Sequence, residues 1–364
     1  MLIVGAGPVG LSAAIESNRR GFAVRIIDKS SVRTDLSKAV AINARTLGLL
    51  EPSGITPRLL AAGIRIDGIN LRDEDRILTR IRFSKLPAPY NFMLSLPQSE
   101  TERILEDALA ERGIRIERET VLTDFTQDGN GIEANLLQDG IEIQHRADYV
   151  AGCDGAHSTV RKVLGIGFEG ERYPETWSLA DLHMDWPYGH GEGNLFMRSD
   201  KRLLFVISMP NGRYRAIANA PDVLSLLPKG SHIHDIHWQT EFVVSLRQVN
   251  CYGRNRAYLA GDAAHIHSPA GGRGMNLGIE DVSVLARRID EGGLEGYSRD
   301  RHKAGRKVLR ESDMMFRMSK VGNPVLRAIR NGLIRNILGS ETLQSSFRLR
   351  MAGLHNMVIH GGFS

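Results

Sequence analysis

The pattern of apolar and polar residues at the start of the chain predicts a strand, a helix and a second strand in close succession. Residues 1–4 form a short apolar run that is typical of a buried strand. Apolar residues at helical spacing follow, among them Leu11 and Ala14, and a second apolar run over residues 23–27 ends at Asp28. The chain therefore opens on a β-turn-α-β unit, as Rossmann-like domains do.

Beyond this unit, strand-rich and helical stretches alternate. Residues 67–95 are predicted to be β-rich, and a helix is predicted to begin at Ser99, which would cap it with Glu102 as its capping-box partner. A second β-rich stretch covers residues 176–250, and helical spacing dominates from Asn276 onward. Between them, shorter strands are predicted over residues 115–117, 121–125, 132–137, 141–145 and 149–153.

These stretches predict an α/β fold in which a Rossmann-like lobe is interleaved with a β-rich lobe and followed by a helical C-terminal region. The Rossmann-like lobe is the expected cofactor-binding lobe, and the β-rich lobe is the expected substrate lobe. The predicted boundaries are residues 1–70, 96–175 and 251–290 for the first, 71–95 and 176–250 for the second, and 291–364 for the helical region.

The turn after the first strand carries three glycines with distinct expected tasks. Gly5 would form the tight turn, Gly7 would let the backbone approach a pyrophosphate, and Gly10 would pack the helix closely on the strand. The helix that begins near Pro8 offers free N–H groups and a positive dipole end to phosphates. Asp28 can accept the hydroxyl protons of an adenosine ribose. The unit predicts a dinucleotide site, without distinguishing NAD from FAD.

Composition places the chain among ordinary globular proteins. Hydrophobic residues make up 42% and charged residues 24% of the chain, close to the averages for such proteins. No apolar run approaches the roughly 18 residues that a membrane helix needs, so no stable membrane insertion is expected. The apolar opening runs into a patterned helix and is not expected to be a secretory signal. Cys153 and Cys251 are too few for a disulfide framework, which favours a reducing cytoplasm.

The net charge is +5, and arginines become frequent between Arg299 and Arg335. No nucleic-acid motif accompanies them, and mild positive charge also suits an enzyme whose cofactor and reductant carry phosphates. No nucleic-acid partner is therefore expected. The basic stretch over residues 308–338 carries apolar residues at helical spacing, and it favours packing helices over a helix on a membrane surface.

Two other kinds of site lack support in the sequence. His232, His234 and His237 suggest a metal cluster, but no cysteine or paired carboxylate completes it, and their spacing suits an ordinary strand or loop. No metal is therefore expected. The sequence has no Gly-x-Ser-x-Gly turn, which argues against a serine hydrolase.

Three motifs occur in one order along the chain. The glycine turn with Asp28 comes first, the segment CDGAHSTVR at residues 153–161 second, and the segment YLAGDAAHIHSPAGGRGMN at residues 258–276 third. Together they resemble the single-component FAD-dependent aromatic hydroxylases of the para-hydroxybenzoate hydroxylase type. Residues 43–46 and 97–99 match further landmarks of that family, so the resemblance extends over nearly the whole chain.

The resemblance implies roles for individual residues. Asp262 would hold the ribityl chain of FAD, and Gln98 would contact its sugar-phosphate region. Asp154 would support both FAD and the transient docking of nicotinamide, with a purely structural role as the alternative. Pro269 would line the space where the flavin hydroperoxide forms, and Arg45 would lie near the phosphates on the path of the moving flavin, unless it forms a surface ion pair. The remaining expected FAD contacts are Lys29, Val121, Gly272, Gly274, Met275 and Asn276.

One residue departs from the family pattern. Arg273 stands where the family more usually has glutamine, and it would either add positive charge beside the flavin or point to solvent. The helix beginning near Asn276 would aim its positive end at the pyrimidine side of the flavin, where the reduced ring carries negative charge.

The activity that the resemblance implies is aromatic hydroxylation. NADPH or NADH would reduce non-covalently bound FAD, O2 would add to form a flavin C4a-hydroperoxide, and a small phenolic or polycyclic substrate would receive the oxygen. A flavin-dependent dehydrogenase or reductase, and a non-catalytic FAD-binding regulatory protein, are the alternatives. The substrate-activating base is not identified, since His183, Tyr188 and Tyr214 in the β-rich stretch have the residue types of ordinary packing positions.

Overall fold

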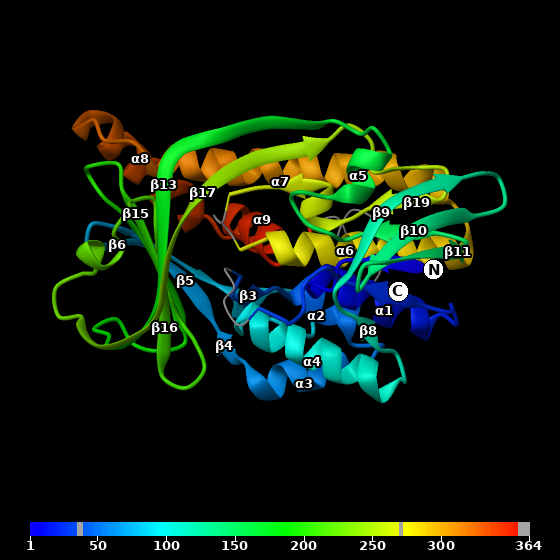
Figure 1. The fold of residues 1–364 in the computed structure, drawn as a ribbon. Coiled ribbons are helices and arrows are strands. Elements are labelled where there is room, and N and C mark those ends of the chain that lie inside the picture. Colours follow the sequence, from blue (N-terminus) through cyan, green and yellow to red (C-terminus); the bar gives the residue numbers. More distant parts are fainter. Residues whose placement is uncertain (35–38, 269–271, 356–364) are drawn as a thin grey trace.

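The computed structural model describes residues 1–34, 39–268 and 272–355, and Figure 1 shows two lobes with helices along one side. The first lobe is built on a six-stranded sheet in the order β18-β19-β12-β1-β2-β8. All of its neighbouring strands are parallel except the β18–β19 pair. The strands are β1 (Leu2–Val4), β2 (Arg25–Ile27), β8 (Ile116–Glu117), β12 (Val150–Gly152), β18 (Gly253–Arg254) and β19 (Ala257–Leu259).

Helices cover this sheet because their apolar residues face it. In α1 (Pro8–Arg19), Leu11, Ala14 and Ile15 are fully buried. The helices α4 (Gln98–Glu111) and α6 (Gly274–Glu291) pack beside α1. Shorter helices of this lobe are α2 (Ala44–Leu50), α3 (Ile55–Ala62) and α5 (Thr159–Val163).

The predicted cap of α4 is wrong. The helix begins at Gln98, and its N-terminal flanking residue is Pro97, which has no side-chain cap. Ser99 therefore lies inside the first turn rather than ahead of it. Proline suits a position before a helix because its fixed φ and missing N–H cost nothing there.

Two small antiparallel sheets flank the first lobe. One is a meander of β9 (Thr120–Gln127), β10 (Ile132–Gln138) and β11 (Ile141–Ala147). Its second turn has positive φ at both Asp139 and Gly140, the conformation of a two-residue hairpin, as the Asp-Gly pair predicts. The other joins β3 (Ala41–Ile42), β7 (Met93–Ser95) and β4 (Ile64–Ile66).

The second lobe is an eight-stranded sheet in the order β20-β17-β13-β16-β15-β14-β5-β6. Its two longest strands, β13 (Phe168–Asp185) and β17 (His232–Val249), run together between the two lobes in Figure 1. The other strands are β5 (Gly68–Asp73), β6 (Arg76–Arg82), β14 (Glu192–Met197), β15 (Leu203–Ser208), β16 (Arg213–Ala218) and β20 (His265–Ile266). Strand β5 begins at residue 68, inside the predicted β-rich stretch 67–95 but ahead of the predicted lobe boundary at residue 71. Strand β13 begins at residue 168, ahead of the predicted residue 176. The division into lobes stays a prediction.

The C-terminal region consists of α7 (Tyr297–Ser319), α8 (Pro324–Gly339) and α9 (Glu341–Met351). Within the described residues, no helix combines the length and apolar character needed to cross a bilayer. The predicted fold class, an α/β protein with a Rossmann-like lobe, a β-rich lobe and a helical C-terminal region, is confirmed. In the part of the chain that the structure describes, 3₁₀ turns lie at Phe83–Lys85, Leu224–Leu226, Gly261–Ala263 and Leu294–Gly296.

Candidate cofactor site

The sequence motifs meet at one edge of the six-stranded sheet. The strands β19, β12, β1 and β2 are consecutive neighbours and parallel, so their carboxyl ends lie side by side. Asp262 follows β19 and Asp154 follows β12, while the glycine turn follows β1 and Asp28 follows β2. In open parallel sheets this edge is where nucleotides bind.

The three glycines of the turn differ in their surroundings. Gly5 has a φ of +101°, and a Cβ added to it would lie 2.5 Å from the carbonyl oxygen of Cys153. A Cβ on Gly10 would lie 1.8 Å from the carbonyl oxygen of Gly5, whereas one on Gly7 would meet nothing within 4 Å. Gly5 and Gly10 thus have the geometry of a tight turn and of close helix packing, and Gly7 faces space through which a phosphate can approach.

Asp28 ties the tip of β2 to the glycine turn. Its Oδ2 accepts the N–H of Ala6 at 2.6 Å, and its Oδ1 accepts the N–H of Ser30 at 2.8 Å. Each carboxylate oxygen can accept a further bond, so Asp28 keeps acceptor capacity for ribose hydroxyls. The backbone N–H of Thr120 also donates to the Asp28 carbonyl at 3.0 Å, which brings the start of β9 and the exposed Val121 close to this corner.

Asp154 serves a structural purpose and retains an unused oxygen. Its Oδ2 accepts the N–H groups of Thr159 at 2.6 Å and Val160 at 3.2 Å, at the start of α5. Its Oδ1 is buried and has no hydrogen-bond partner among the described residues. Burial raises the pKa of Asp154. A buried acceptor without a partner at this edge fits a site that a polar cofactor completes.

A buried charge network supports the turn that contains Asp262. Asp281 of α6 accepts the N–H of Gly261 at 3.0 Å, and its carboxylate also bonds His265 Nε2 and Arg301 Nε, each at 2.6 Å. Burial by itself would raise the pKa of Asp281, but Arg301 and the other donors hold it below its usual range. Glu280 gives Arg301 a second acidic partner at 3.0 Å. No motif in the sequence predicted this network, because its members lie on separate elements.

The start of α6 joins the loop before it to the segment that leads into α2. Asn276 Oδ1 accepts the N–H of Asn43 at 2.9 Å, and Asn276 Nδ2 donates to the carbonyls of Ala41 and Gly272, each at 2.8 Å. Asn276 is therefore a positioning residue for this corner. Among the described residues the helix has no side-chain cap, so the N–H groups of Gly274, Met275 and Asn276 in its first turn stay available to a ligand.

Arg273 does not point freely to solvent, one of its two expected orientations, but forms an ion pair. It precedes α6, is largely buried, and its Nη1 donates to Glu311 Oε2 of α7 at 2.6 Å. Glu311 compensates its charge, so Arg273 neither points freely to solvent nor presents an unpaired charge to the flavin.

His267 was missed by sequence reasoning. Its Nδ1 lies 2.9 Å from the Ser268 carbonyl, and its Nε2 is buried without a partner among the described residues. Burial lowers its pKa to about 4, so the ring is neutral near pH 7. A Cβ added to Gly274 would lie 3.6 Å from Nε2, which places this acceptor at the start of α6. Its position in the third motif, two residues after His265, was the available signal.

The remaining predicted site residues are dispersed around this edge. The Gln98 backbone N–H donates to the Ala39 carbonyl at 3.1 Å, beside the corner that Asn276 organises. Arg45 lies in α2, where burial lowers its pKa. Lys29 is exposed, and Met275 is buried in the core of the first lobe. Pro269 lies outside the described residues.

Most of the polar candidates in the β-rich lobe do not reach this edge. Tyr214 packs in the core on one face of the large sheet, and Tyr188 donates to Asp75 at 3.1 Å. His183 is exposed. Arg215, the neighbour of Tyr214 on β16, points to the opposite face, where it forms a buried ion pair with Asp181 and donates to the Ala39 carbonyl at 3.1 Å.

Comparison with known proteins agrees with this geometry. The family model described as "FAD binding domain" matches residues 1–312. Pentachlorophenol 4-monooxygenase of Sphingobium chlorophenolicum is 36% identical over 310 residues, covering 79% of this chain and 57% of the relative. 6-Methylpretetramide 4-monooxygenase of Streptomyces rimosus is 32% identical over 318 residues, covering 82% and 57%. The chain thus spans little more than half the length of these two relatives.

Solved structures show the same fold. A p-nitrophenol 4-monooxygenase from Pseudomonas putida superposes with a TM-score of 0.88 at 23% identity, covering 97% of both chains. An anhydrotetracycline hydroxylase from Streptomyces rimosus gives 0.80 at 28% identity, covering 97% of this chain and 75% of the other. The resemblance to FAD-dependent aromatic hydroxylases that the sequence predicted is confirmed.

Proposed function

Because this chain belongs to the FAD-binding-domain family, we propose that it is an FAD-dependent monooxygenase that hydroxylates a small aromatic compound with NADPH or NADH and O2. The observation that carries the proposal is the convergence of four parallel strand ends, which brings the glycine turn, Asp28, Asp154 and Asp262 to one edge. When bound, FAD supplies the redox chemistry, taking electrons from the nicotinamide and passing them to O2.

The chain's own residues would bind and orient the cofactor. The N–H groups at the start of α1, with open space above Gly7, suit the pyrophosphate, and Asp28 suits the ribose. The uncapped first turn of α6 offers N–H groups and a positive dipole end to the flavin ring. Asp262, Gln98, Arg45, Lys29 and Val121 are further proposed contacts, carried over from the family resemblance, and Pro269 with Arg45 are the proposed catalytic residues.

The aromatic substrate would lie between the start of α6 and the face of the large sheet that carries Arg215. The Arg215–Asp181 pair is buried on that face, and Trp238 lies beneath the guanidinium at 5.7 Å. A polar pair among apolar side chains suits a phenolic ring, which has one polar end. The relatives named as monooxygenases of pentachlorophenol and of 6-methylpretetramide support an aromatic substrate.

A reducing compartment is part of the proposal. Cys153 and Cys251 are both free thiols, and burial raises the pKa of Cys153, so its thiol stays protonated and unreactive.

The proposal is tested with the purified protein and a panel of phenols. We expect a yellow protein that releases intact FAD on denaturation, together with oxidation of NADPH or NADH that an aromatic compound stimulates. O2 uptake should match hydroxylated product. Nicotinamide oxidation without any oxygenated product would instead indicate a flavin reductase, and a protein that binds no FAD would refute both activities.

Replacing Asp28 with alanine is expected to weaken FAD binding about ten- to a hundredfold. The change removes a charge-assisted ribose acceptor worth roughly 1.5–3 kcal/mol, and it also frees the Ala6 N–H that holds the turn. Fluorescence titration of the apoprotein measures the effect. Glu117→Ala, which removes the ion pair with Arg25 at the neighbouring strand β8, is the matched control and should bind FAD normally. Equal affinities in both variants would exclude Asp28 from the ribose site.

The two charges of the Arg273–Glu311 pair are expected to shift the flavin midpoint potential in opposite directions and so to cancel in the parent protein. Arg273→Gln removes one positive charge and leaves Glu311 paired only with Arg350, at 3.8 Å. It should lower the midpoint potential, because the remaining negative charge disfavours the reduced anionic ring. Glu311→Gln should raise it, and the double variant should return close to the parent value. Dye-coupled reductive titration measures all four proteins. Identical potentials across the set would place the pair beyond electrostatic reach of the flavin.

A further inference from the structure

Helix α8 presents one apolar face to solvent and turns two of its arginines toward the protein. Val325, Ile329, Leu333 and Ile337, spaced four residues apart, are 67%, 54%, 50% and 43% exposed. Residues four apart lie on one face of a helix, so these form a continuous apolar stripe, which Leu326 widens at its start. Arg330 is buried. This is the reverse of the polarity of an ordinary surface helix.

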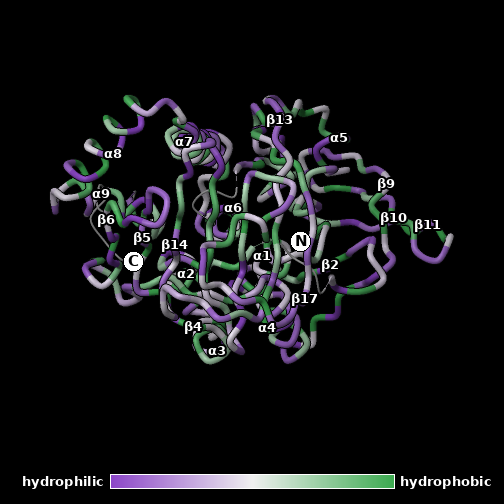
Figure 2. The backbone as a smooth tube through the Cα atoms, turned by 90° about the vertical axis from the view of Figure 1, so that its left-hand side faces the viewer, coloured by the Kyte–Doolittle hydropathy of each residue, from purple (hydrophilic) through white to green (hydrophobic). Residues whose placement is uncertain are grey.

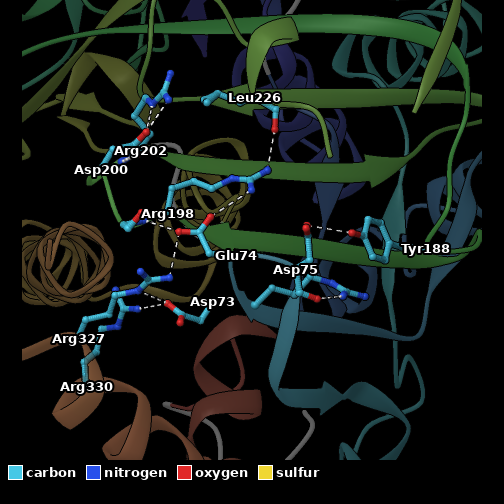
Figure 3. Close-up of polar contacts among 12 residues, drawn as sticks. Asp73, Glu74, Asp75, Tyr188, Arg198, Asp200, Arg202, Leu226, Arg327 and Arg330 are labelled. Carbon is cyan, nitrogen blue, oxygen red and sulfur yellow. Dashed lines mark hydrogen bonds and ion pairs between the residues drawn. The ribbon is translucent and has the colours of Figure 1, made fainter. Parts of the chain in front are cut away.

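Ion pairs fix this orientation of α8. Figure 3 shows Arg327 and Arg330 reaching Asp73, at the end of β5, where each donates to Oδ1 at 2.7 Å. Arg327 also donates to Glu74 at 3.0 Å, and Glu74 is held in turn by Arg198. On the same inner side, Ile334 and Leu338 enter the core beneath the large sheet. Rolling the helix to bury its stripe would break these ion pairs and expose that core.

The stripe lies in the most basic part of the chain. Residues 299–350 hold thirteen lysines and arginines against four acids. Arg301, Lys320, Arg327 and Arg330 pair with acids outside this range, which leaves nine cations against four acids. Helix α8 contains no acidic residue, and its Arg335 is exposed with no ion-pair partner among the described residues. The outer side of α7 adds the exposed Lys303, Arg306 and Arg310.

We propose that α8 binds an anionic lipid surface, with its stripe at the boundary between headgroups and acyl chains. An apolar helix face in a cationic region is the combination that such surfaces recognise. Helix α8 has sixteen residues and lies at the outer edge of the molecule in Figures 1 and 2, so it would rest on the surface rather than cross it. A second copy of the chain is the poorer occupant, because it would bring two such cationic regions together.

Vesicle flotation of the chain of residues 1–364 tests the proposal. We expect the protein to float with vesicles of phosphatidylcholine and phosphatidylglycerol. With vesicles of phosphatidylcholine alone, we expect it to remain in the bottom fraction of the gradient. The double variant Ile329→Asn, Leu333→Asn should lose at least about tenfold in partitioning, because it removes two central side chains of the stripe. Arg335→Gln should lose about fivefold on the anionic vesicles, since one cation near such a surface contributes about that factor.

The matched control is Ile141→Asn, which removes a side chain that is 65% exposed on β11. It should float like the parent protein. Retained FAD in every variant, seen as flavin absorbance, shows that the first lobe is intact. Equal flotation of the parent and the double variant would overturn the proposal. So would a parent protein that ignores anionic vesicles, including one that elutes as a dimer which the double variant converts to monomer.

Discussion

Replacing Asp281 with asparagine is expected to destabilise the protein by about 3–5 kcal/mol, the cost of removing one partner from a buried ion pair. Asp281 is fully buried, and its carboxylate bonds Arg301, His265 and the N–H of Gly261. Asparagine keeps the shape and one acceptor oxygen but leaves Arg301 with only Glu280 for charge. FAD affinity should fall as well, because Gly261 begins the turn that carries Asp262. Urea denaturation and FAD titration measure the two effects.

Asp290→Asn on the same helix is the matched control. Its carboxylate pairs with Arg20 at 2.8 Å but is 42% exposed, and exposed pairs contribute about 0–1 kcal/mol. The two substitutions make the same chemical change on one helix and differ in burial. Equal denaturation midpoints for the two variants would contradict the importance assigned to the buried network.

The destabilisation by Asp281→Asn should depend on pH in one direction. The pKa of Asp281 in the folded protein lies below its ordinary value. Such a carboxylate stabilises the fold above its unfolded pKa of about 4, and this contribution is lost as the pH falls through the folded value. The difference in unfolding free energy between the parent and the variant should thus be complete at pH 7 and should shrink below about pH 4.

The cofactor edge was predictable because short-range motifs and one topological rule suffice to define it. The glycine turn, Asp28 and the segment at residues 153–161 each follow a predicted strand, and parallel strands place their carboxyl ends together. The glycine turn and Asp28 show this most directly, since the residues of one β-turn-α-β unit are local in sequence. The hydrogen bonds of Asp28 to Ala6 and Ser30 could not be predicted, because they depend on side-chain rotamers.

The supporting residues were not predictable, because they meet only in the folded chain. Asp281 and Arg301 lie twenty residues apart on different helices, and Asn276 reaches back more than two hundred residues to Asn43. A single sequence has no periodic signal for such pairs. Arg273 is an example. The sequence shows that it replaces the glutamine that is more usual in the family, but it does not show that Arg273 pairs with Glu311.

The sequence could not predict which side of α8 faces the protein, for the same reason. Apolar residues at helical spacing predict a buried face, and residues 308–338 were expected to pack for that reason. The inner side of α8 does carry Ile334 and Leu338, but ion pairs to Asp73 from a distant hairpin decide which side is the inner one. The second apolar side therefore remains exposed.

The second large effect is expected at the glycine turn, where two neighbouring glycines should respond differently to the same change. Gly10→Ala places a methyl group where it would lie 1.8 Å from the Gly5 carbonyl oxygen, so the backbone of α1 or of the turn must shift. Overpacking of this kind costs about 1–3 kcal/mol or more. We expect the apoprotein to be destabilised by at least this amount and FAD binding to be lost.

Gly7→Ala should separate cofactor binding from folding. Its methyl group would meet no protein atom within 4 Å, and its backbone φ of −75° suits alanine. The stability of the apoprotein should therefore change by less than about 0.5 kcal/mol. FAD affinity should fall roughly tenfold or more, because the methyl group would occupy the space through which the pyrophosphate approaches the turn. Urea denaturation without cofactor, paired with FAD titration, measures both quantities in each variant. If Gly7→Ala binds FAD as tightly as the parent protein, the open space above Gly7 does not hold the phosphates, and the cofactor must enter this edge of the sheet in another orientation.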